Sequence, residues 1–210
     1  MSQALEWLRL GGPTMAVLLL LSVATVTIVL VKLWEFWDQR IWDTRFVPRV
    51  IESWQRGFAD QALSAIAASP SPLAEVMREA ITLSVDDTLN DAQARERIES
   101  FAAQRLDALR GLLRPLEVIS QMAPLLGLLG TVAGMIQAFQ QLQAAGDRVS
   151  PAILSGGLWE ALLTTAGGLA IAILALAAFN FLERQVERLQ LRMEAVLTQL
   201  LTSGPALRGS

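Results

Sequence analysis

The 210-residue chain is 53% hydrophobic and 18% charged, too apolar for an ordinary soluble domain of this length, and we expect an all-α integral membrane protein. Cysteine and histidine are both absent, which argues against disulfide frameworks, thiol or imidazole catalysis and the usual zinc sites. We therefore expect no enzyme, no cofactor and no metal. The net charge is −3 and the basic residues are scattered, so no nucleic-acid partner is expected.

The first predicted transmembrane helix covers residues 11–33, after a short segment at 1–10. Residues 11–31 carry no charge, and at about 1.5 Å per residue this run spans about 31 Å, close to the hydrocarbon thickness of a bilayer. A signal peptide would need a basic start and a cleavage site between small residues, whereas Glu6 and Arg9 precede the run and Lys32 follows it. We do not expect cleavage.

The charges around this first helix predict its orientation. Basic residues accumulate after the run, and three tryptophans there form a plausible belt at the membrane interface: the residues are Lys32, Arg40, Arg45, Arg49, Trp34, Trp37 and Trp42. By the positive-inside rule, residues 1–10 lie on the outer side and the chain after the helix lies in the cytoplasm.

Residues 34–114 read as a cytoplasmic helical segment. Helical periodicity is interrupted at Pro48 and at residues 69–72, and we interpret the charges as a solvated bundle face, with a specific docking surface as the alternative. In its last part, apolar residues recur on one helix face: Ile98, Phe101, Leu106, Leu109 and Leu113. No strong break precedes Pro115, which predicts a helix longer than the bilayer is thick.

Residues 115–142 form the second predicted span, followed by a short outer link at 143–151. Small residues recur in this span at spacings that let helix backbones approach closely, and we assign Gly127, Gly130 and Gly134 to close packing. Thr131 lies near its middle. Its hydroxyl can bond a carbonyl of its own helix, or face a pore or a carboxylate on another helix, and the sequence alone leaves both open.

Residues 152–182 return inward as the third span, and residues 183–210 form a cytoplasmic helix and tail. Gly167 and Gly168 again permit close packing. Arg184, Arg188 and Arg192 mark the cytoplasmic end, and the amphipathic sequence around them predicts that the third helix continues beyond the membrane. The prediction is three spans, with the N-terminus outside and the C-terminus inside.

Glu160 is the only acidic residue between positions 149 and 182. An ionised carboxylate near the bilayer centre costs roughly 2.5 to 3.5 kcal/mol, so such residues usually face a bundle interior or an ion path. Thr164 shares its helix face, whereas Thr165 is rotated by about 140°. The alternative is an interfacial Glu160, because the charge-free run from 161 to 182 is about 33 Å long and could span without it.

The motifs PLLGLLGTVAGMIQAF at 124–139 and GGLWEALLTTAGGLAIAILALAAFNFL at 156–182 together resemble the ExbB/TolQ/MotA family of ion-channel subunits, most closely ExbB and TolQ. The resemblance implies a multi-pass protein of the bacterial inner membrane, with a periplasmic N-terminus and a cytoplasmic C-terminus. It also implies a homopentamer around a central pore, with the helices of an ExbD- or TolR-like partner inside the pore.

Carried over position by position, the resemblance makes Glu160 the proton relay. Thr131 and Thr165 become polar pore-lining residues, and Asn180 supplies a hydrogen bond at the inner vestibule. Helix geometry pairs Glu160 with Thr164 instead, so Thr164 is kept as the second choice.

The function implied is a proton-channel stator subunit that couples the proton-motive force, through an ExbD-like and a TonB-like partner, to transport across the outer membrane. A TolQ-like subunit working with TolR and TolA for envelope integrity is the alternative; a four-span flagellar stator fits less well, because three spans are visible. From another class, a membrane scaffold with an interfacial Glu160 would conduct nothing. The sequence does not decide whether protons or sodium ions are conducted. It predicts contact with membrane lipids and with these partners.

Overall fold

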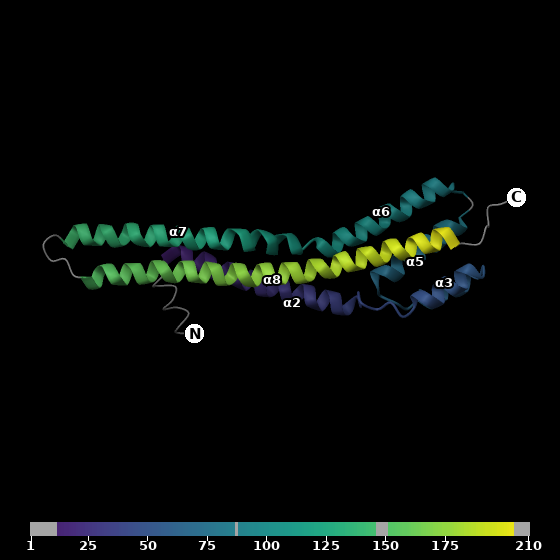
Figure 1. Ribbon diagram of the computed structural model, residues 1–210, viewed down its shortest axis with the longest axis horizontal. Coiled ribbons are helices and arrows are strands. Elements are labelled where there is room, and N and C mark those ends of the chain that lie inside the picture. Colours follow the sequence, from purple (N-terminus) through teal and green to yellow (C-terminus); the bar gives the residue numbers. More distant parts are fainter. Residues whose placement is uncertain (1–11, 87, 146–150, 204–210) are drawn as a thin grey trace. The chain divides into compact units, whose positions relative to one another are not determined.

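The computed structural model describes residues 12–86, 88–145 and 151–203, which form helices and no strand (Figure 1). In chain order these are α2 (Gly12–Asp38), α3 (Val47–Gln55), α4 (Ala59–Ile66), α5 (Pro72–Val85), α6 (Asp91–Arg110), α7 (Leu113–Ala145) and α8 (Pro151–Ser203). Three stretches are long and apolar enough to cross a membrane: Pro13–Asp38, Leu113–Ala144 and Ser155–Ser203. The predicted all-α fold with three candidate membrane helices is confirmed.

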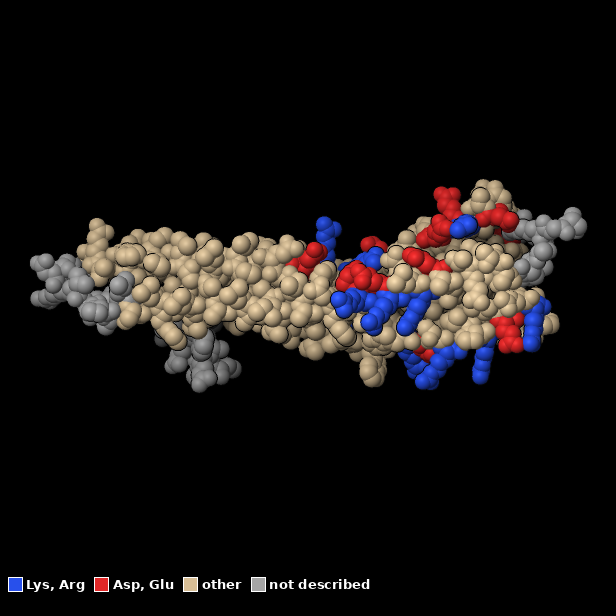
Figure 2. Space-filling view, viewed as in Figure 1, with Lys and Arg blue, Asp and Glu red and all other residues tan. Residues whose placement is uncertain are grey.

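The chain divides into two compact units. Unit 1 comprises residues up to Val31 together with Leu112–Phe181, and unit 2 comprises Lys32–Gly111 together with the residues from Leu182 onward. Figure 2 shows the Lys, Arg, Asp and Glu side chains gathered over the helices of unit 2, whereas the described surface of unit 1 is almost free of them in this view. Charged residues therefore lie mainly in unit 2, and the described residues of unit 1 are mainly uncharged.

Unit 1 has a small core and a largely exposed apolar surface. Leu18, Ala123 and Ala172 bring together one residue each from α2, α7 and α8, with Met15 and Ile171 among the side chains packed around them. In the most apolar stretch of each span, at most 22% of the residues are buried within the chain. So much exposed apolar surface is suited to contact with lipid or with further protein chains.

Unit 2 has a conventional buried core centred on α5. Leu73, Val76, Met77 and Ile81 of α5 are almost completely buried, and α3, α4 and α6 add further apolar side chains. On α6 the buried residues are Ala94, Ile98, Ala102, Leu106 and Leu109, at the three- and four-residue spacing of one helix face. This face includes three of the five positions named from the sequence; Phe101 is only half-buried, and Leu113 belongs to α7.

A turn separates α6 from α7, where the sequence suggested a continuous approach to Pro115. The helix α6 ends at Arg110, and α7 begins at Leu113. Glycine at 111 lowers helix stability by about 1 kcal/mol relative to alanine, and Pro115 has no N–H to bond the Gly111 carbonyl. The helix α7 still has 33 residues, about 50 Å, and α8, for which the sequence separately predicts an extension, has 53 residues and continues past the end of the predicted third span at 182.

The predicted N-terminal segment 1–10 and part of the link 143–151 lie outside the described residues. The helix α7 ends at Ala145 and α8 begins at Pro151.

Candidate functional site

Glycines let the backbones of α7 and α8 come into direct contact. A Cβ atom added at Gly127 would lie 3.0 Å from the Thr164 carbonyl oxygen and 3.1 Å from the Thr165 Cα. One added at Gly168 would lie 2.5 Å from the Ala123 carbonyl oxygen. A real Cβ atom does not come as close to a backbone atom as it would at Gly168, and at Gly127 it would push the two helices a few tenths of an ångström apart, so glycine suits both positions.

Thr164 fills the space that the missing side chain of Gly130 leaves open. A Cβ at Gly130 would lie 2.5 Å from the Thr164 Oγ1, and Thr164 is only 2% exposed. Its hydroxyl donates to the Ala161 carbonyl at 2.7 Å and also lies 3.4 Å from the Gly127 carbonyl oxygen. Thr164 is therefore a packing residue of the α7–α8 contact in this chain, although it shares a helix face with Glu160.

Thr165 is half-buried and links the two helices by a hydrogen bond. Its Oγ1 donates to the Gly127 carbonyl oxygen at 3.0 Å. In an α-helix that same carbonyl pairs with the N–H of Thr131, four residues later. Three threonines therefore meet at the Gly127 carbonyl. Thr131 contacts it through its backbone N–H, and Thr164 and Thr165 contact it through their side chains.

The Thr131 hydroxyl bonds within its own helix. Its Oγ1 donates to the Leu128 carbonyl at 2.7 Å, and the side chain is half-buried. Of the two possibilities that the sequence leaves open, the structure shows the hydrogen bond within the same helix, to the carbonyl three residues earlier. A hydroxyl that donates its proton still has lone pairs to accept from water or another chain, so the oxygen stays available as an acceptor.

Glu160 is a half-buried carboxylate without a partner among the described residues. It lies in the stretch Ser155–Ser203 that could span a membrane, nine residues after the start of α8, or about 14 Å along the helix. No described residue donates a hydrogen bond to its carboxylate or forms an ion pair with it. Because a charge in a low-dielectric medium needs compensation, its partner must come from water, from another chain or from residues outside the described ranges.

Asn180 lies apart from the threonines. It is 15 residues beyond Thr165, or about 22 Å along α8, and its side chain is exposed and makes no hydrogen bond with a described residue. The structure thus brings Thr131, Thr164 and Thr165 together around Gly127, while Asn180 stands alone on the surface of α8.

The contact between α7 and α8 also uses two alanines that the sequence argument did not single out, Ala138 and Ala161. A Cβ at Gly157 would lie 2.6 Å from the Ala138 Cβ, and one at Gly134 would lie 3.0 Å from the Ala161 Cβ. A Cβ at Gly167 would meet nothing within 4 Å. In the sequence, Gly157 is four residues before Ala161, and this spacing continues the row of small residues in the contact toward the start of α8.

The described residues contain no group of three or more His, Cys, Asp or Glu side chains that could hold a metal ion. The candidate residues in the spans of unit 1 present the hydroxyls of three threonines, the amide of Asn180 and the carboxylate of Glu160, which can bind and pass protons or coordinate water.

Comparison with known families places the chain. Residues 68–195, more than half of the sequence, match the model of the MotA/TolQ/ExbB proton channel family. The chain belongs to this family. The matched residues include Thr131, Glu160, Thr165 and Asn180. Together with the three apolar helices, membership makes the chain a multi-pass membrane protein of the MotA/TolQ/ExbB type.

Three relatives in this family carry the ExbB name. The chain is 30% identical over 148 residues to a biopolymer transport protein ExbB homolog of Methanothermobacter thermautotrophicus, covering 70% of this chain and 51% of that protein. It is 41% identical over 85 residues to biopolymer transport protein exbB1 of Vibrio cholerae, covering 40% and 37%. It is 30% identical over 152 residues to biopolymer transport protein ExbB of Neisseria gonorrhoeae, covering 67% and 69%.

The match therefore spans about half of the Methanothermobacter protein and less of the Vibrio protein. The family of proton-channel subunits is established by these matches, and the resemblance noted in the two motifs is confirmed.

Proposed function

We propose that this family member is a stator subunit of the bacterial inner membrane that passes protons through Glu160 and couples their flow to a partner protein. The observation that carries the proposal is the unpartnered Glu160 carboxylate in a stretch that can span the membrane. A carboxylate that has no partner among the described residues, in a stretch that can span the membrane, is suited to take up a proton and release it.

The polar residues around Gly127 are assigned supporting roles. Thr165 ties α8 to α7 and keeps the helix face that carries Glu160 in a defined position. Thr131, whose hydroxyl oxygen can still accept a hydrogen bond, is assigned to the polar lining of the path. Asn180 is assigned to its inner end, and Thr164 to packing.

The proposed assembly is a homopentamer around an ExbD- or TolR-like subunit. Support comes from the apolar surface that the three spans leave exposed in a single chain. It also comes from the ExbB names of the relatives. In such a ring, five copies of Glu160 would surround the helices of the partner. The proposed orientation, with a periplasmic N-terminus and a cytoplasmic C-terminus, rests on Arg184, Arg188 and Arg192 after the third span.

Work at the outer membrane through a TonB-like protein is the proposed output, because relatives are named for biopolymer transport. A TolQ-like role with TolR and TolA in envelope integrity is the competing output. Purification of the complex from the native membrane, followed by identification of the bound proteins by mass spectrometry, separates the two.

The test of the channel is proton flux into liposomes that contain the chain with its co-purified partner, driven by a potassium diffusion potential and read with a pH-sensitive dye. We expect Glu160→Gln to abolish the flux while the mass of the complex stays the same. Glu187→Gln is the matched control, because it removes an exposed carboxylate of the same helix in unit 2.

A non-conducting scaffold is the alternative from another class. The observation in its favour is that Glu160 is only half-buried and precedes a charge-free run long enough to span by itself. If the proton flux is equal in the Glu160→Gln and unsubstituted complexes, the channel proposal is overturned. The result would then favour a scaffold with Glu160 at the membrane interface.

A further inference from the structure

The basic residues of unit 2 fall into two groups according to whether the chain supplies a partner. Those with a carboxylate within 3.0 Å or a carbonyl acceptor at 2.9 Å are Lys32 with Glu35, Arg56 with Glu52, Arg95 with Glu99, Arg105 with Glu75, Arg110 with Glu183, and Arg78 with the Ile66 carbonyl. Those whose side chains have no partner among the described residues are Arg40, Arg45, Arg49, Arg97, Arg184, Arg188 and Arg192.

All of the unpartnered arginines except Arg97 lie along two neighbouring segments. The Trp42 Nε1 donates to the Gln185 Oε1 at 3.1 Å, and the Trp54 Nε1 donates to the Leu200 carbonyl at 3.0 Å. These two bonds hold α3 and the turn before it beside α8. We use the name basic face for a set of six residues: Arg40, Arg45, Arg49, Arg184, Arg188 and Arg192. Figure 2 shows Lys and Arg side chains in blue over the helices of unit 2.

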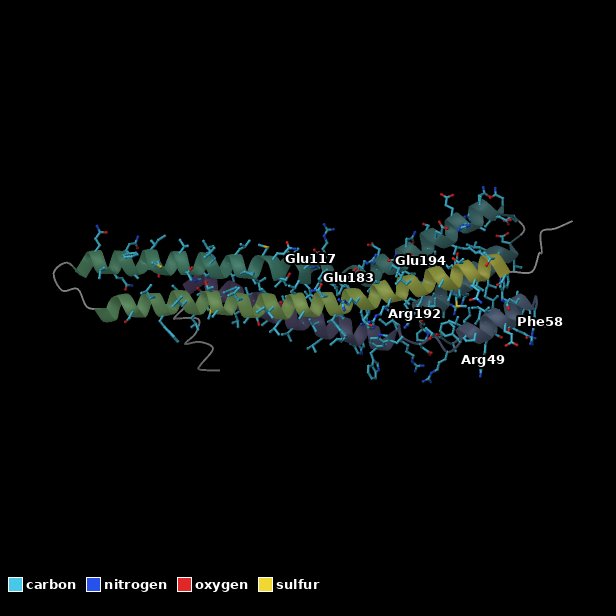
Figure 3. The ribbon with its side chains drawn as sticks, in the orientation of Figure 1. Arg49, Phe58, Glu117, Glu183, Arg192 and Glu194 are labelled. Carbon is cyan, nitrogen blue, oxygen red and sulfur yellow. The ribbon has the colours of Figure 1, made fainter. Side chains whose placement is uncertain are left out.

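On α8 the arginines form a stripe, because Arg184, Arg188 and Arg192 follow one another at four-residue intervals on one side of the helix. All three are exposed, and Figure 3 labels Arg192 on α8 and Arg49 on α3. Like charges four residues apart destabilise a helix. No described carboxylate forms an ion pair with these three arginines, whereas most other basic residues of unit 2 have a partner.

Few acidic groups border the basic face. Glu187 is exposed beside Arg188, and the Asp43 Oδ1 accepts a hydrogen bond from the Arg45 backbone N–H. Asp38 closes α2 just before the face begins. The face keeps an excess of positive charge on a chain whose net charge is −3. Charge is thus segregated rather than mixed on this surface.

We propose that the basic face binds an acidic peptide segment of another protein. Successive arginines of the stripe are about 6 Å apart along α8, close to the roughly 6.8 Å between alternate residues of an extended chain and to the spacing of carboxylates four residues apart in a helix. Arginine binds carboxylates through paired N–H groups, which suits a repeated Asp or Glu pattern.

The length of the stripe favours a peptide over a bilayer surface. Arg184 lies two residues after Leu182, close enough to the end of an apolar run to reach lipid headgroups, and Arg40 lies two residues after the end of α2 at Asp38. The headgroup zone is only about 5 to 8 Å deep on each side, whereas Arg192 lies about 15 Å beyond Leu182 along α8. An anionic bilayer would therefore engage only the first arginines of the face.

A second copy of the chain is a weaker match. Glu75, Glu99 and Glu183 are already paired with arginines of their own chain. The unpaired acids that α6 exposes, Glu96 and Asp107, are accompanied by the equally unpaired Arg97. Among the described residues, α6 therefore offers no acidic surface comparable in extent to the basic face.

The test uses the full chain in nanodiscs of neutral lipid and a fluorescein-labelled peptide of six Glu-Ala repeats, with binding measured by anisotropy. Replacing Arg49, Arg188 and Arg192 by Gln should weaken binding about 10-fold at about 0.1 M salt, because three charge-assisted contacts are lost. Replacing Arg56, Arg95 and Arg97 by Gln changes the net charge equally off the face, and should weaken binding by less than about 2-fold. Circular dichroism and size-exclusion chromatography verify the fold of both variants.

Four results would overturn the proposal: no binding of the Glu-Ala peptide, equal loss of binding in both triple variants, equally tight binding of a Gln-Ala peptide, or complete displacement of the peptide by phosphatidylglycerol vesicles. A loss of oligomer mass confined to the Arg49, Arg188 and Arg192 variant would also overturn it and assign the face to a second copy. The assay does not depend on the ion path, so Glu160→Gln should bind the peptide normally, and the two proposals fail separately.

Discussion

The Thr165 hydroxyl of α8 donates a hydrogen bond to the Gly127 carbonyl of α7 at 3.0 Å. Gly127 has no side chain to hold the helices apart, so the glycine makes both the close approach and the bond possible. The bond thus joins the two spans at the level where the three threonines of the candidate site meet.

Thr165→Val should therefore weaken the contact between α7 and α8. The valine keeps the shape of threonine but removes the donor, and we expect a loss of about 1 kcal/mol together with reduced proton flux. Thr165→Ser keeps the hydroxyl and should retain most of both. Thermal unfolding in detergent and the liposome flux assay measure the two effects, and identical behaviour of the valine and serine variants would contradict the assigned role.

Gly130→Ala should be strongly destabilising, by about 1 to 3 kcal/mol, because its Cβ would lie 2.5 Å from the Thr164 Oγ1. Gly167→Ala is the matched control in α8. Its Cβ would meet nothing within 4 Å, so the better helix propensity of alanine should leave stability unchanged or slightly higher. Both are measured by thermal unfolding of the purified chain. Equal destabilisation would show that the packing of the two helices differs from that described.

Lys32→Met should destabilise unit 2 through the partners that it leaves behind. The Lys32 ammonium is 1% exposed, pairs with the Glu35 Oε2 at 2.8 Å and donates to the Leu109 carbonyl at 2.7 Å. Removing it strands a partly buried carboxylate and a carbonyl, for which we expect a cost of about 2 kcal/mol.

The double variant Lys32→Met with Glu35→Gln should recover part of this loss, because the stranded charge is gone. The exposed pair provides the comparison, since Arg56→Gln should change stability by less than about 0.5 kcal/mol. Thermal unfolding of the three variants decides, and a double variant no more stable than Lys32→Met would argue against a stranded charge.

Trp54→Phe should loosen α3 from α8. The indole N–H donates to the Leu200 carbonyl at 3.0 Å in a buried position, so phenylalanine leaves that carbonyl without this donor, at a cost of about 1 to 3 kcal/mol. Trp42→Phe removes a bond in an exposed position and should cost less. Proteolysis between α3 and α4 offers a local measurement, and faster cleavage in the Trp42 variant would reverse the expected order.

Part of the candidate site could be predicted from the sequence and part could not. Glu160 stands out as the only acidic residue in its run, and its helix face follows from a fixed rotation per residue. The same periodicity cannot show that Thr164 is enclosed by α7, because this depends on Gly130 of a different helix. Gly167 and Gly168 look equivalent in the sequence, yet only Gly168 contacts α7, since neighbouring residues on a helix point about 100° apart.

The sequence by itself determined the number of candidate membrane helices, most of the buried face of α6 and the family, because apolar runs, helical spacing and motifs are properties of the chain alone. Only the tertiary structure decided that Thr165 bonds Gly127, that Thr164 packs against Gly130, and that six arginines without partners lie along neighbouring segments. These depend on which helix faces meet, and close contact between residues far apart in the chain is set by packing in three dimensions, which no local pattern specifies.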